Sequence, residues 1–367
     1  ELLSRAQELE AQGRSVIHLE VGEPDFATPQ PIVDAGMAAL RGRLPYTQAL
    51  GLPALRAAIS AYYAERFGVE VDPARIVITA GASGALLLAL GTLIDPGDQV
   101  LLTDPGYPCN RQFVRALEGQ AVSLPVSAVS HYQLTAAMIE SAWGARTAAV
   151  LLASPANPTG TLVPTPMLQA IYKLVRARGG ALIVDEIYQG LVYDSEPQTA
   201  LSFADDAFII NSFSKYFQMT GWRLGWLVVP RGYVREVEKL AQNLFICAST
   251  PAQFAALAAF SPETLIIAEQ RRAEFRARRD YFLPALRELG FDIPLTPEGA
   301  FYLYADCSRF TRDSQQFAWD LLERTGVAIT PGIDFGGNDT QRYVRLSYCA
   351  ALPVLEEAVS RLRNCLG

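Results

Sequence analysis

Apolar residues along this chain occur in runs that predict two kinds of secondary structure. Six short segments are apolar at consecutive positions: RIVITAG, QVLLTDPG, AAVLLASP, ALIVDEIY, FIINSFSK and LGWLVVP. Consecutive apolar residues are typical of strands that are buried on both faces, as in parallel sheets. Because helical runs alternate with these segments, the pattern predicts an α/β fold with a mostly parallel, seven-stranded type of sheet between layers of helices.

The pattern changes beyond about residue 261. A long charged helix is expected over TLIIAEQRRAEFRARRDYFLPALREL, with arginines on one face and apolar residues on the other. FYLYADC and YVRLSYC then alternate as half-exposed antiparallel strands do, and helical runs accompany them. The N-terminal helix and strand are too short to fold alone. We therefore predict a large α/β domain over residues 41–260 and a smaller, discontinuous α+β domain made of residues 1–40 and 261–367.

Composition and charge exclude several classes of protein. Half of the 367 residues are hydrophobic, which argues against disorder, and the formal net charge of −7 has the wrong sign for a nucleic-acid partner. Two histidines are too few for a His-rich metal site. Five scattered cysteines without a CxxC pair suit a reducing compartment. Since neither a membrane span nor a signal peptide is visible, we expect a cytoplasmic protein that binds no membrane and no metal.

Groups suited to a single ligand lie at the ends of the predicted strands. In open α/β sheets, ligands bind beyond the carboxyl ends of the strands. Each group has an ordinary explanation as a turn or cap residue, but six strand ends in succession are hard to explain in that way. In chain order the groups are Ala82 and Ser83 at a helix start, Tyr107, Asn157, Asp185 with Tyr188, Ser212 with Ser214 and Lys215, and finally Arg223.

The chemistry of these groups defines the ligand. Burial raises the pKa of a carboxyl such as Asp185 and is costly unless a cation meets it, although a helix cap is an equally ordinary role. Lys215 can form a Schiff base with an aldehyde. Ser212, Ser214 and Arg223 can hold a phosphate together with the backbone N–H groups of a helix start. Together they describe a phosphorylated aromatic aldehyde with a cationic ring nitrogen, which is pyridoxal 5′-phosphate (PLP).

The order and spacing of the motifs resemble those of the class I/II, fold-type I, PLP-dependent aminotransferases along essentially the whole chain. The resemblance implies a homodimer with shared active sites that moves an amino group from an L-amino acid to a 2-oxo acid. The matching motifs are GEPDF (22–26), Tyr46 in PYTQALGLPALR, NPTG (157–160), DEIY (185–188), SFSK (212–215), TGWRLG (220–225) and Arg345 in YVRLSY.

This resemblance also implies a role for each residue near the ring of the cofactor. Lys215 would hold PLP as an internal aldimine and then shuttle the Cα proton of the substrate. Asp185 would keep the ring nitrogen protonated. Tyr188 and Asn157 would hydrogen-bond the ring oxygen, and Tyr107 would lie against the ring face.

The remaining implied roles concern the phosphate and the substrate. Arg345 would bind the α-carboxylate of the substrate, aided by Gly22 and Asn157. The phosphate ligands implied by the resemblance are Ala82, Ser83, Ser212, Ser214 and Arg223, with Tyr46 reaching in from the neighbouring subunit.

Substrate preference and reaction type are less tightly defined. Ser83 stands where relatives with dicarboxylic substrates carry a longer cationic residue, and the candidates for the side-chain pocket are Phe26, Phe301 and the turn at 331–336. These candidates predict an apolar or aromatic preference. A β-eliminating lyase or a synthase on the same fold is the alternative. A sensor module of a transcription regulator would need a DNA-binding domain, and a nicotinamide dehydrogenase would need GxGxxG, neither of which this chain contains.

Overall fold

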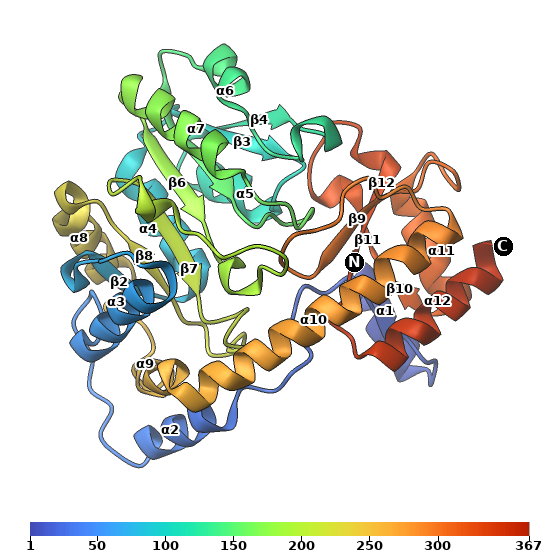
Figure 1. Cartoon of the computed structure of the whole chain (residues 1–367), viewed down its shortest axis with the longest axis horizontal. Helices are drawn as coiled ribbons and strands as arrows, with labels where there is room; N and C mark the ends of the chain where they lie inside the picture. Colours follow the sequence, from blue (N-terminus) through green and yellow to red (C-terminus); the bar gives the residue numbers. More distant parts are fainter. Residues whose placement is uncertain (367) are drawn as a thin grey trace.

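A computed structural model describes residues 1–366 and contains, within them, a seven-stranded sheet with the order β2-β8-β7-β6-β5-β3-β4 (Figure 1). Strand β8 runs antiparallel to both of its neighbours, and the other pairs are parallel. The predicted, mostly parallel sheet is therefore confirmed. The strands are β2 (Ile76–Thr79), β3 (Gln99–Asp104), β4 (Gln120–Pro125), β5 (Thr147–Ala153), β6 (Ala181–Asp185), β7 (Phe208–Ser212) and β8 (Gly225–Val228).

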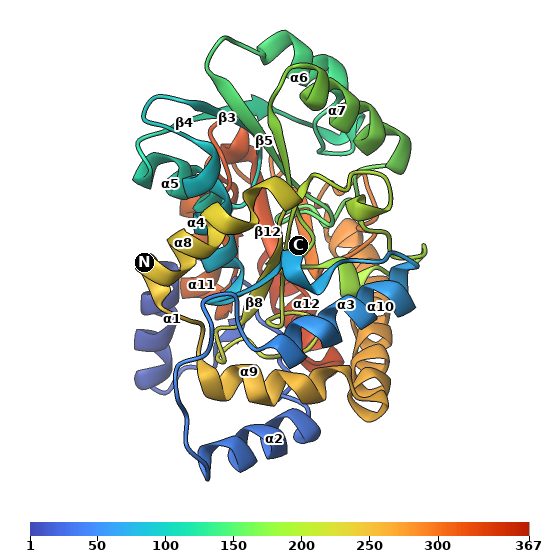
Figure 2. The same cartoon turned by 90° about the vertical axis from the view of Figure 1, so that its left-hand side faces the viewer.

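Helices cover both faces of this sheet (Figures 1 and 2). In β6, Leu182 and Val184 belong to one hydrophobic cluster and Ile183 to another, because successive side chains point to opposite faces. This two-sided burial explains the consecutive apolar positions of the strands. The first cluster includes residues of α3 (Pro53–Phe67), α6 (Ala136–Ala142) and α7 (Thr165–Ala177), and the second includes residues of α4 (Gly81–Leu93), α5 (Pro108–Ala116) and α8 (Val234–Phe245).

The sequence analysis did not identify β4, which lies at the edge of the sheet. Its residues are half-buried or exposed, unlike those of the central strands. Because none of its side chains is fully buried, β4 lacks the continuous apolar run by which the other strands were found. Strand β2, at the opposite edge, is buried at every position and was predicted from its apolar run.

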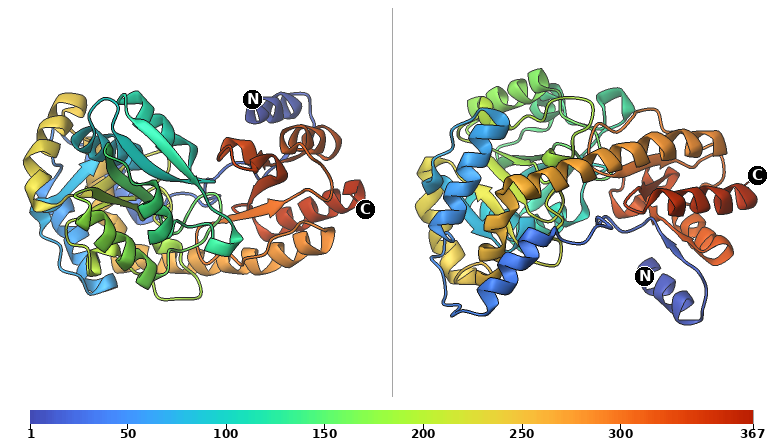
Figure 3. Two further views of the ribbon diagram at one scale, coloured as in Figure 1. Left: turned by 90° about the horizontal axis from the view of Figure 1, so that it is seen from above. Right: turned by 60° about the horizontal axis from the view of Figure 1, so that its bottom comes forward.

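A second, smaller group of elements follows α10 (Pro262–Leu289), which runs from the large sheet to the C-terminal elements (Figures 1 and 3). Its antiparallel sheet has the order β11-β12-β9. A parallel pair, β1 with β10, lies beside it. The bounds are β1 (Ile17–His18), β9 (Tyr302–Asp306), β10 (Val327–Ala328), β11 (Thr330–Pro331) and β12 (Tyr343–Ser347), with helices α1 (Leu2–Ala11), α11 (Ser314–Thr325) and α12 (Leu352–Leu366).

The antiparallel direction of β9 and β12 confirms one expectation, but their predicted half-exposure is wrong. All of β9 and all but the first residue of β12 are buried. The reason is that the second face of this sheet meets the larger part of the chain. The ring of Tyr302 packs against Tyr188, and the ring of Tyr304 packs against Tyr132.

The arginines of α10 do not all form a solvated face. Arg278 and Arg279 are only 2% and 3% exposed. Arg278 pairs with Asp25 at 2.7 Å, and Arg279 pairs with Asp194 at 2.6 Å. These buried guanidinium groups therefore attach the long helix to two loops that are distant from it in sequence.

The first forty residues divide between the two groups of elements. Strand β1 pairs with β10, and Ala6 and Leu9 of α1 pack against Leu322. Helix α2 (Gln30–Leu40) instead lies beside α9 (Thr250–Leu257), as Figure 2 shows. The domain boundaries remain a prediction, and this packing favours a boundary nearer residue 30 than residue 40.

Two further features of residues 1–366 bear on function. None of the helices within this range combines the length and the apolar character that crossing a membrane requires. The same residues hold no group of three or more histidine, cysteine or carboxylate side chains placed to bind a metal ion.

Candidate active site

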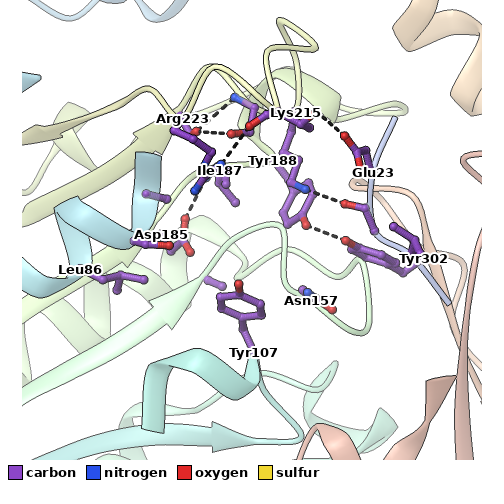
Figure 4. Close-up of a pocket in the computed structure, with 18 of the residues that line it drawn as sticks. Glu23, Leu86, Tyr107, Asn157, Asp185, Ile187, Tyr188, Lys215, Arg223 and Tyr302 are labelled. Carbon is purple, nitrogen blue, oxygen red and sulfur yellow. Dashed lines mark hydrogen bonds between the residues drawn. The ribbon is translucent and has the colours of Figure 1, made fainter. Parts of the chain in front are cut away.

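A cavity of about 580 Å³ lies beyond the carboxyl ends of β6 and β7, where the large sheet meets β9 and β12 (Figure 4). The residues predicted to bind the cofactor or the α-carboxylate are spread over most of the sequence, yet all of them except Tyr46 line this cavity. Those that line the cavity are Gly22, Ala82, Ser83, Tyr107, Asn157, Asp185, Tyr188, Ser212, Ser214, Lys215, Arg223 and Arg345.

Lys215 follows β7 and projects its amine into the cavity (Figure 4). Its Nζ donates a 2.6 Å hydrogen bond to the carbonyl oxygen of Gly22. Burial lowers the pKa of Lys215 to about 8, because the charged ammonium is poorly solvated. The unprotonated amine, which is the form that attacks a carbonyl, is therefore much more abundant near neutral pH than in an exposed lysine.

Asp185 ends β6 and is 5% exposed. One of its carboxylate oxygens accepts a 3.0 Å hydrogen bond from the backbone N–H of Ile187. Burial raises the pKa of Asp185 to about 6, while that N–H and the charge of Lys215 act in the opposite direction. No ion pair involves this carboxylate within residues 1–366, so a cationic group that entered the cavity would relieve its desolvation.

Glu186, which follows Asp185 in the sequence, is buried in different surroundings. Glu186 is 2% exposed, and its Oε1 accepts hydrogen bonds from the Thr199 hydroxyl at 3.1 Å and from the Ala200 N–H at 2.8 Å. Burial raises the pKa of Glu186 to about 8. Two neighbouring carboxyl groups thus lie in different surroundings, and only Asp185 lines the cavity.

A site for an anion lies at the start of α4. Among the described residues, none caps this helix with its side chain, so the first backbone N–H groups are left for a ligand. The hydroxyls of Ser212 and Ser214 lie 2.9 Å apart beside it. Gly81 has a positive φ of 68°, and a Cβ there would lie 2.8 Å from the guanidinium of Arg223. Glycine thus lets a cation approach the helix start, which suits a phosphate.

Arg345 lies on β12 at the opposite side of the cavity and is 7% exposed. One guanidinium nitrogen donates to Asn157 Oδ1 at 3.0 Å and the other to the carbonyl of Glu20 at 2.5 Å. The guanidinium carbon lies 4.4 Å from the ring centre of Tyr302 and 4.8 Å from that of Phe335. An arginine fixed on two aromatic faces presents its edge in a defined orientation, as carboxylate recognition requires.

Several sequence-based expectations about the walls of the cavity are wrong. Phe26 packs against Phe275, and Phe301 packs against Tyr188, but neither lines the cavity. The turn at 331–336 does not line it either, and its Phe335 instead stacks on Arg345. An apolar residue near a motif can support the site from behind, and its spacing in the sequence does not reveal which layer it occupies.

Other lining residues escaped the sequence analysis. Glu23 stands in the GEPDF motif, and its carboxylate accepts a hydrogen bond from Thr220. Tyr302 lies within FYLYADC, where its only signal was that of an ordinary strand residue. Tyr46 has a different position from all of these, since it is 78% exposed and does not line the cavity of its own chain.

The fold is that of an α/β enzyme. One cavity brings together a nucleophilic amine, a buried carboxylate and an anion cup, which is formed by the start of α4 with Ser212, Ser214 and Arg223. The model of the family "Aminotransferase class I and II" matches residues 14–362. The chain belongs to this family, and it is an aminotransferase.

Relatives and solved structures agree with this assignment. The chain is 43% identical over 354 residues to a valine–pyruvate aminotransferase of Mycobacterium tuberculosis, covering 96% of this chain and 91% of that protein. It is 37% identical to a (5-formylfuran-3-yl)methyl phosphate transaminase of Methanocaldococcus jannaschii, covering 100% and 96%. A crystal structure of an aminotransferase from Mycobacterium tuberculosis superposes with a TM-score of 0.96 at 42% identity, covering 100% and 95%. The lyase alternative gains no support from these relatives.

Proposed function

We propose that this aminotransferase binds PLP in the cavity at Lys215 and uses it to move the α-amino group of an L-amino acid to a 2-oxo acid. The observation that supports this most strongly is the placement of Lys215, Asp185 and the anion cup around one cavity. When bound, PLP supplies an electron sink for the negative charge that develops at the Cα of the substrate.

Each residue then has a defined task at the cofactor. Lys215 attaches the cofactor through its Nζ and afterwards moves the proton at the substrate Cα. Asp185 accepts a hydrogen bond from the ring nitrogen and holds the proton there. Tyr188 and Asn157 would hydrogen-bond the ring oxygen, and Tyr107 would pack against the ring.

The phosphate and the substrate carboxylate take opposite ends of the cavity. The phosphate accepts hydrogen bonds from the start of α4, at Ala82 and Ser83, and from Ser212, Ser214 and Arg223. The α-carboxylate of the substrate pairs with Arg345, whose fork of N–H groups matches its two oxygens. Gly22 and Asn157 border this second site.

We infer further that the preferred substrates have an uncharged side chain. The three cationic residues that line the cavity are Lys215, Arg223 and Arg345, and each already has a task. Glu23 adds an acidic group to the lining, so a second carboxylate on the substrate would lack a cation and meet an anion. A relative named valine–pyruvate aminotransferase is consistent with this preference.

The enzyme is proposed to act as a homodimer in which Tyr46 completes the phosphate site of the partner subunit. The loop that carries Tyr46 is fixed to α9, because Thr250 donates to the carbonyl of Pro45 at 2.9 Å. Exposed apolar side chains gather on the neighbouring segments, including Leu40 at 63% and Ile246 at 52% exposure. Such a surface favours association with a second copy of the chain.

One experiment tests the cofactor, the lysine and the reaction type together. The purified protein is loaded with PLP, reduced with borohydride and digested, and the peptide that carries the cofactor is identified. We expect the label on Lys215 and none in a Lys215→Ala variant. Unreduced protein is then mixed with a panel of amino acids. Conversion of the bound cofactor to its amine form supports transamination, whereas release of pyruvate and ammonia without that conversion would indicate a lyase.

A further inference from the structure

Tyr302 is the lining residue whose contacts are least explained by the functions given so far. It stands on β9, is 1% exposed and reaches the cavity with its hydroxyl. Figure 4 shows this hydroxyl directed at that of Tyr188, and the two oxygens are 2.7 Å apart. A residue needed only for packing would not require a polar group at this point, since leucine or phenylalanine also fills a core.

The space around Tyr302 shows that its hydroxyl position is fixed. A Cβ added to Gly22 would overlap the Tyr302 hydroxyl, so only glycine leaves room for this oxygen. The carbonyl of the same Gly22 accepts the hydrogen bond from Lys215. Tyr302 is therefore held between the segment that contacts the lysine amine and the side chain of Tyr188.

The hydrogen bond between the two tyrosines has a direction if Tyr188 serves the cofactor. A hydroxyl has one proton to donate and two lone pairs that accept. If Tyr188 donates its proton to the ring oxygen of the cofactor, it can only accept from Tyr302. Burial raises the pKa of Tyr302 to about 12, so it keeps the proton that it must donate. An accepted hydrogen bond makes Tyr188 a stronger donor in turn.

The face of the same ring supports Arg345. The guanidinium carbon lies 4.4 Å from the centre of the Tyr302 ring, within the range of a cation–π contact. The centre of the Phe335 ring lies 4.8 Å from the same guanidinium carbon. This second function uses the ring of Tyr302 and not its hydroxyl, so the two functions can be separated by substitution.

We propose that Tyr302 is a positioning residue with two separable parts, a hydroxyl that orients the proton of Tyr188 and a ring that holds Arg345 in place for the substrate carboxylate. The proposal rests on the function proposed above for Tyr188 and Arg345. It makes Tyr302 the link between the cofactor half and the substrate half of the site.

Three variants separate the two parts. Tyr302→Phe removes the hydroxyl and keeps the ring, Phe335→Leu removes a ring face of Arg345 without touching Tyr188, and Tyr302→Leu removes both the hydroxyl and the stacked ring. Two quantities are measured on the PLP-loaded proteins. The first is the pH midpoint of the visible absorption, and the second is the dissociation constant of isovalerate, a carboxylate without an amino group, by calorimetry.

The expected results form a crossed pattern. Without the donor at Tyr302, Tyr188 stabilises negative charge on the ring oxygen less well, so Tyr302→Phe raises the absorption midpoint by about half a pH unit, or roughly threefold in proton affinity. Its isovalerate affinity stays within about twofold of the wild type. Phe335→Leu leaves the midpoint in place and weakens isovalerate binding by about tenfold. Tyr302→Leu shows both changes.

Other outcomes overturn the proposal. An unchanged midpoint in Tyr302→Phe excludes the hydroxyl function, and equal isovalerate affinity in Tyr302→Leu and the wild type excludes the ring function. If Tyr302→Leu does not fold, Tyr302→Phe decides the hydroxyl part, and Tyr302→Met, which removes the ring but keeps more of the side-chain volume, decides the ring part. Failure of the wild type to bind PLP would refute the proposed function instead, and isovalerate binding to the cofactor-free variants would then decide the ring function alone.

Discussion

The amine of Lys215 donates a 2.6 Å hydrogen bond to the backbone carbonyl of Gly22, although 193 residues separate the two in the sequence. The contact joins the loop after β7 to the N-terminal segment across the cavity. It also keeps the amine on the side of the cavity where Tyr302 and Arg345 lie. The lysine is therefore held at the centre of the site before any ligand enters.

Replacing Lys215 by alanine should abolish turnover and leave the protein folded. The substitution removes a buried amine whose charged form is poorly solvated, so the free energy of unfolding should not fall by more than ~1 kcal/mol. Activity should fall by at least about a thousandfold, since both attachment of the cofactor and proton movement at Cα are lost. Urea unfolding and initial rates measure the two effects. Lys173→Ala, on the exposed side of α7, is the matched control and should change neither.

The Asp185→Asn variant tests the proposed partner of the ring nitrogen. The amide keeps the size of the side chain but cannot provide the anion that favours a proton on that nitrogen. We expect cofactor binding to persist and removal of the Cα proton to slow by about a thousandfold, or ~4 kcal/mol of transition-state stabilisation. The kinetic isotope effect with Cα-deuterated substrate should increase. Wild-type kinetics in the variant would exclude Asp185 from the mechanism.

The strand ends illustrate how much of this site could be predicted from sequence. Asp185 and Lys215 follow runs of apolar residues, and the carboxyl ends of parallel strands meet at one edge, so their proximity follows from the pattern of the sheet. Tyr302 could not be predicted in this way. It belongs to an antiparallel strand whose second face is covered by the larger part of the chain, and that contact depends on how the two groups of elements pack.

Similar limits apply to Phe26 and Phe301. Both lie close in sequence to residues of the cavity, and sequence proximity placed them in its wall. In the structure they form a layer behind it, in contact with Phe275. Which of two adjacent apolar layers a residue joins depends on side-chain packing and not on periodicity.

Arg345→Leu should discriminate between substrates with and without a carboxylate. Amino acids lose a desolvated, two-pronged ionic contact, so their kcat/KM should fall by about a hundredfold or more. Simple primary amines that carry no carboxylate should react at wild-type rates, because they never used the contact. The ratio of the two kcat/KM values is the measurement. A uniform loss for both substrate types would identify a structural arginine.

The raised pKa of Glu186 should make the free energy of unfolding depend on pH, and substituting this residue should weaken that dependence. Its pKa is raised from 4.5 to about 8 in the folded protein by burial. Between these values the folded state retains a proton that the unfolded state has released, so the free energy of unfolding falls as the pH rises. Asp185, whose folded pKa is about 6, contributes a similar fall only at lower pH. Between pH 6 and pH 8 both Glu186 and His18, whose pKa is also raised by its carboxylate partners, contribute to the fall, and only the Glu186 contribution is removed by substituting Glu186.

In Glu186→Gln the fall over that interval should become smaller, because glutamine is neutral at every pH. Urea unfolding of the cofactor-free protein at pH 6, 7 and 8 gives the slope for each variant. The measurements stop at pH 8, because above it the lowered pKa of Lys215 adds stability while the raised pKa values of the buried Cys307 and Cys349 remove it. Identical slopes between pH 6 and pH 8 would show that Glu186 is ionised in the folded protein.

The proposed sharing of active sites between subunits leads to a prediction about mixed dimers. Tyr46 is 78% exposed and does not line the cavity of its own chain, while its loop is fixed to α9. If it completes the phosphate site of the partner, Tyr46→Glu should inactivate the homodimer by placing an anion beside the phosphate. Lys215→Ala is expected to be inactive for a different reason, because it removes the amine that the other subunit contributes to the same site. A dimer with one subunit of each kind contains one site in which Lys215 and Tyr46 are both wild type.

Mixing the two inactive variants under conditions of confirmed subunit exchange should therefore restore activity. Random exchange of equal amounts makes about half of the dimers mixed, each with one intact site of two, so roughly a quarter of the wild-type activity should return. Mass spectrometry of intact dimers gives the mixed fraction, and activity should scale with it.

Lys215→Ala mixed with Asp185→Asn is the matched control, because both changes lie in the same subunit's share of the site. Each chain supplies Lys215 and Asp185 to the same cavity, so neither cavity of this mixed dimer is complete and no activity should return. Recovery in the control, or none in the Tyr46→Glu mixture, would refute the shared site.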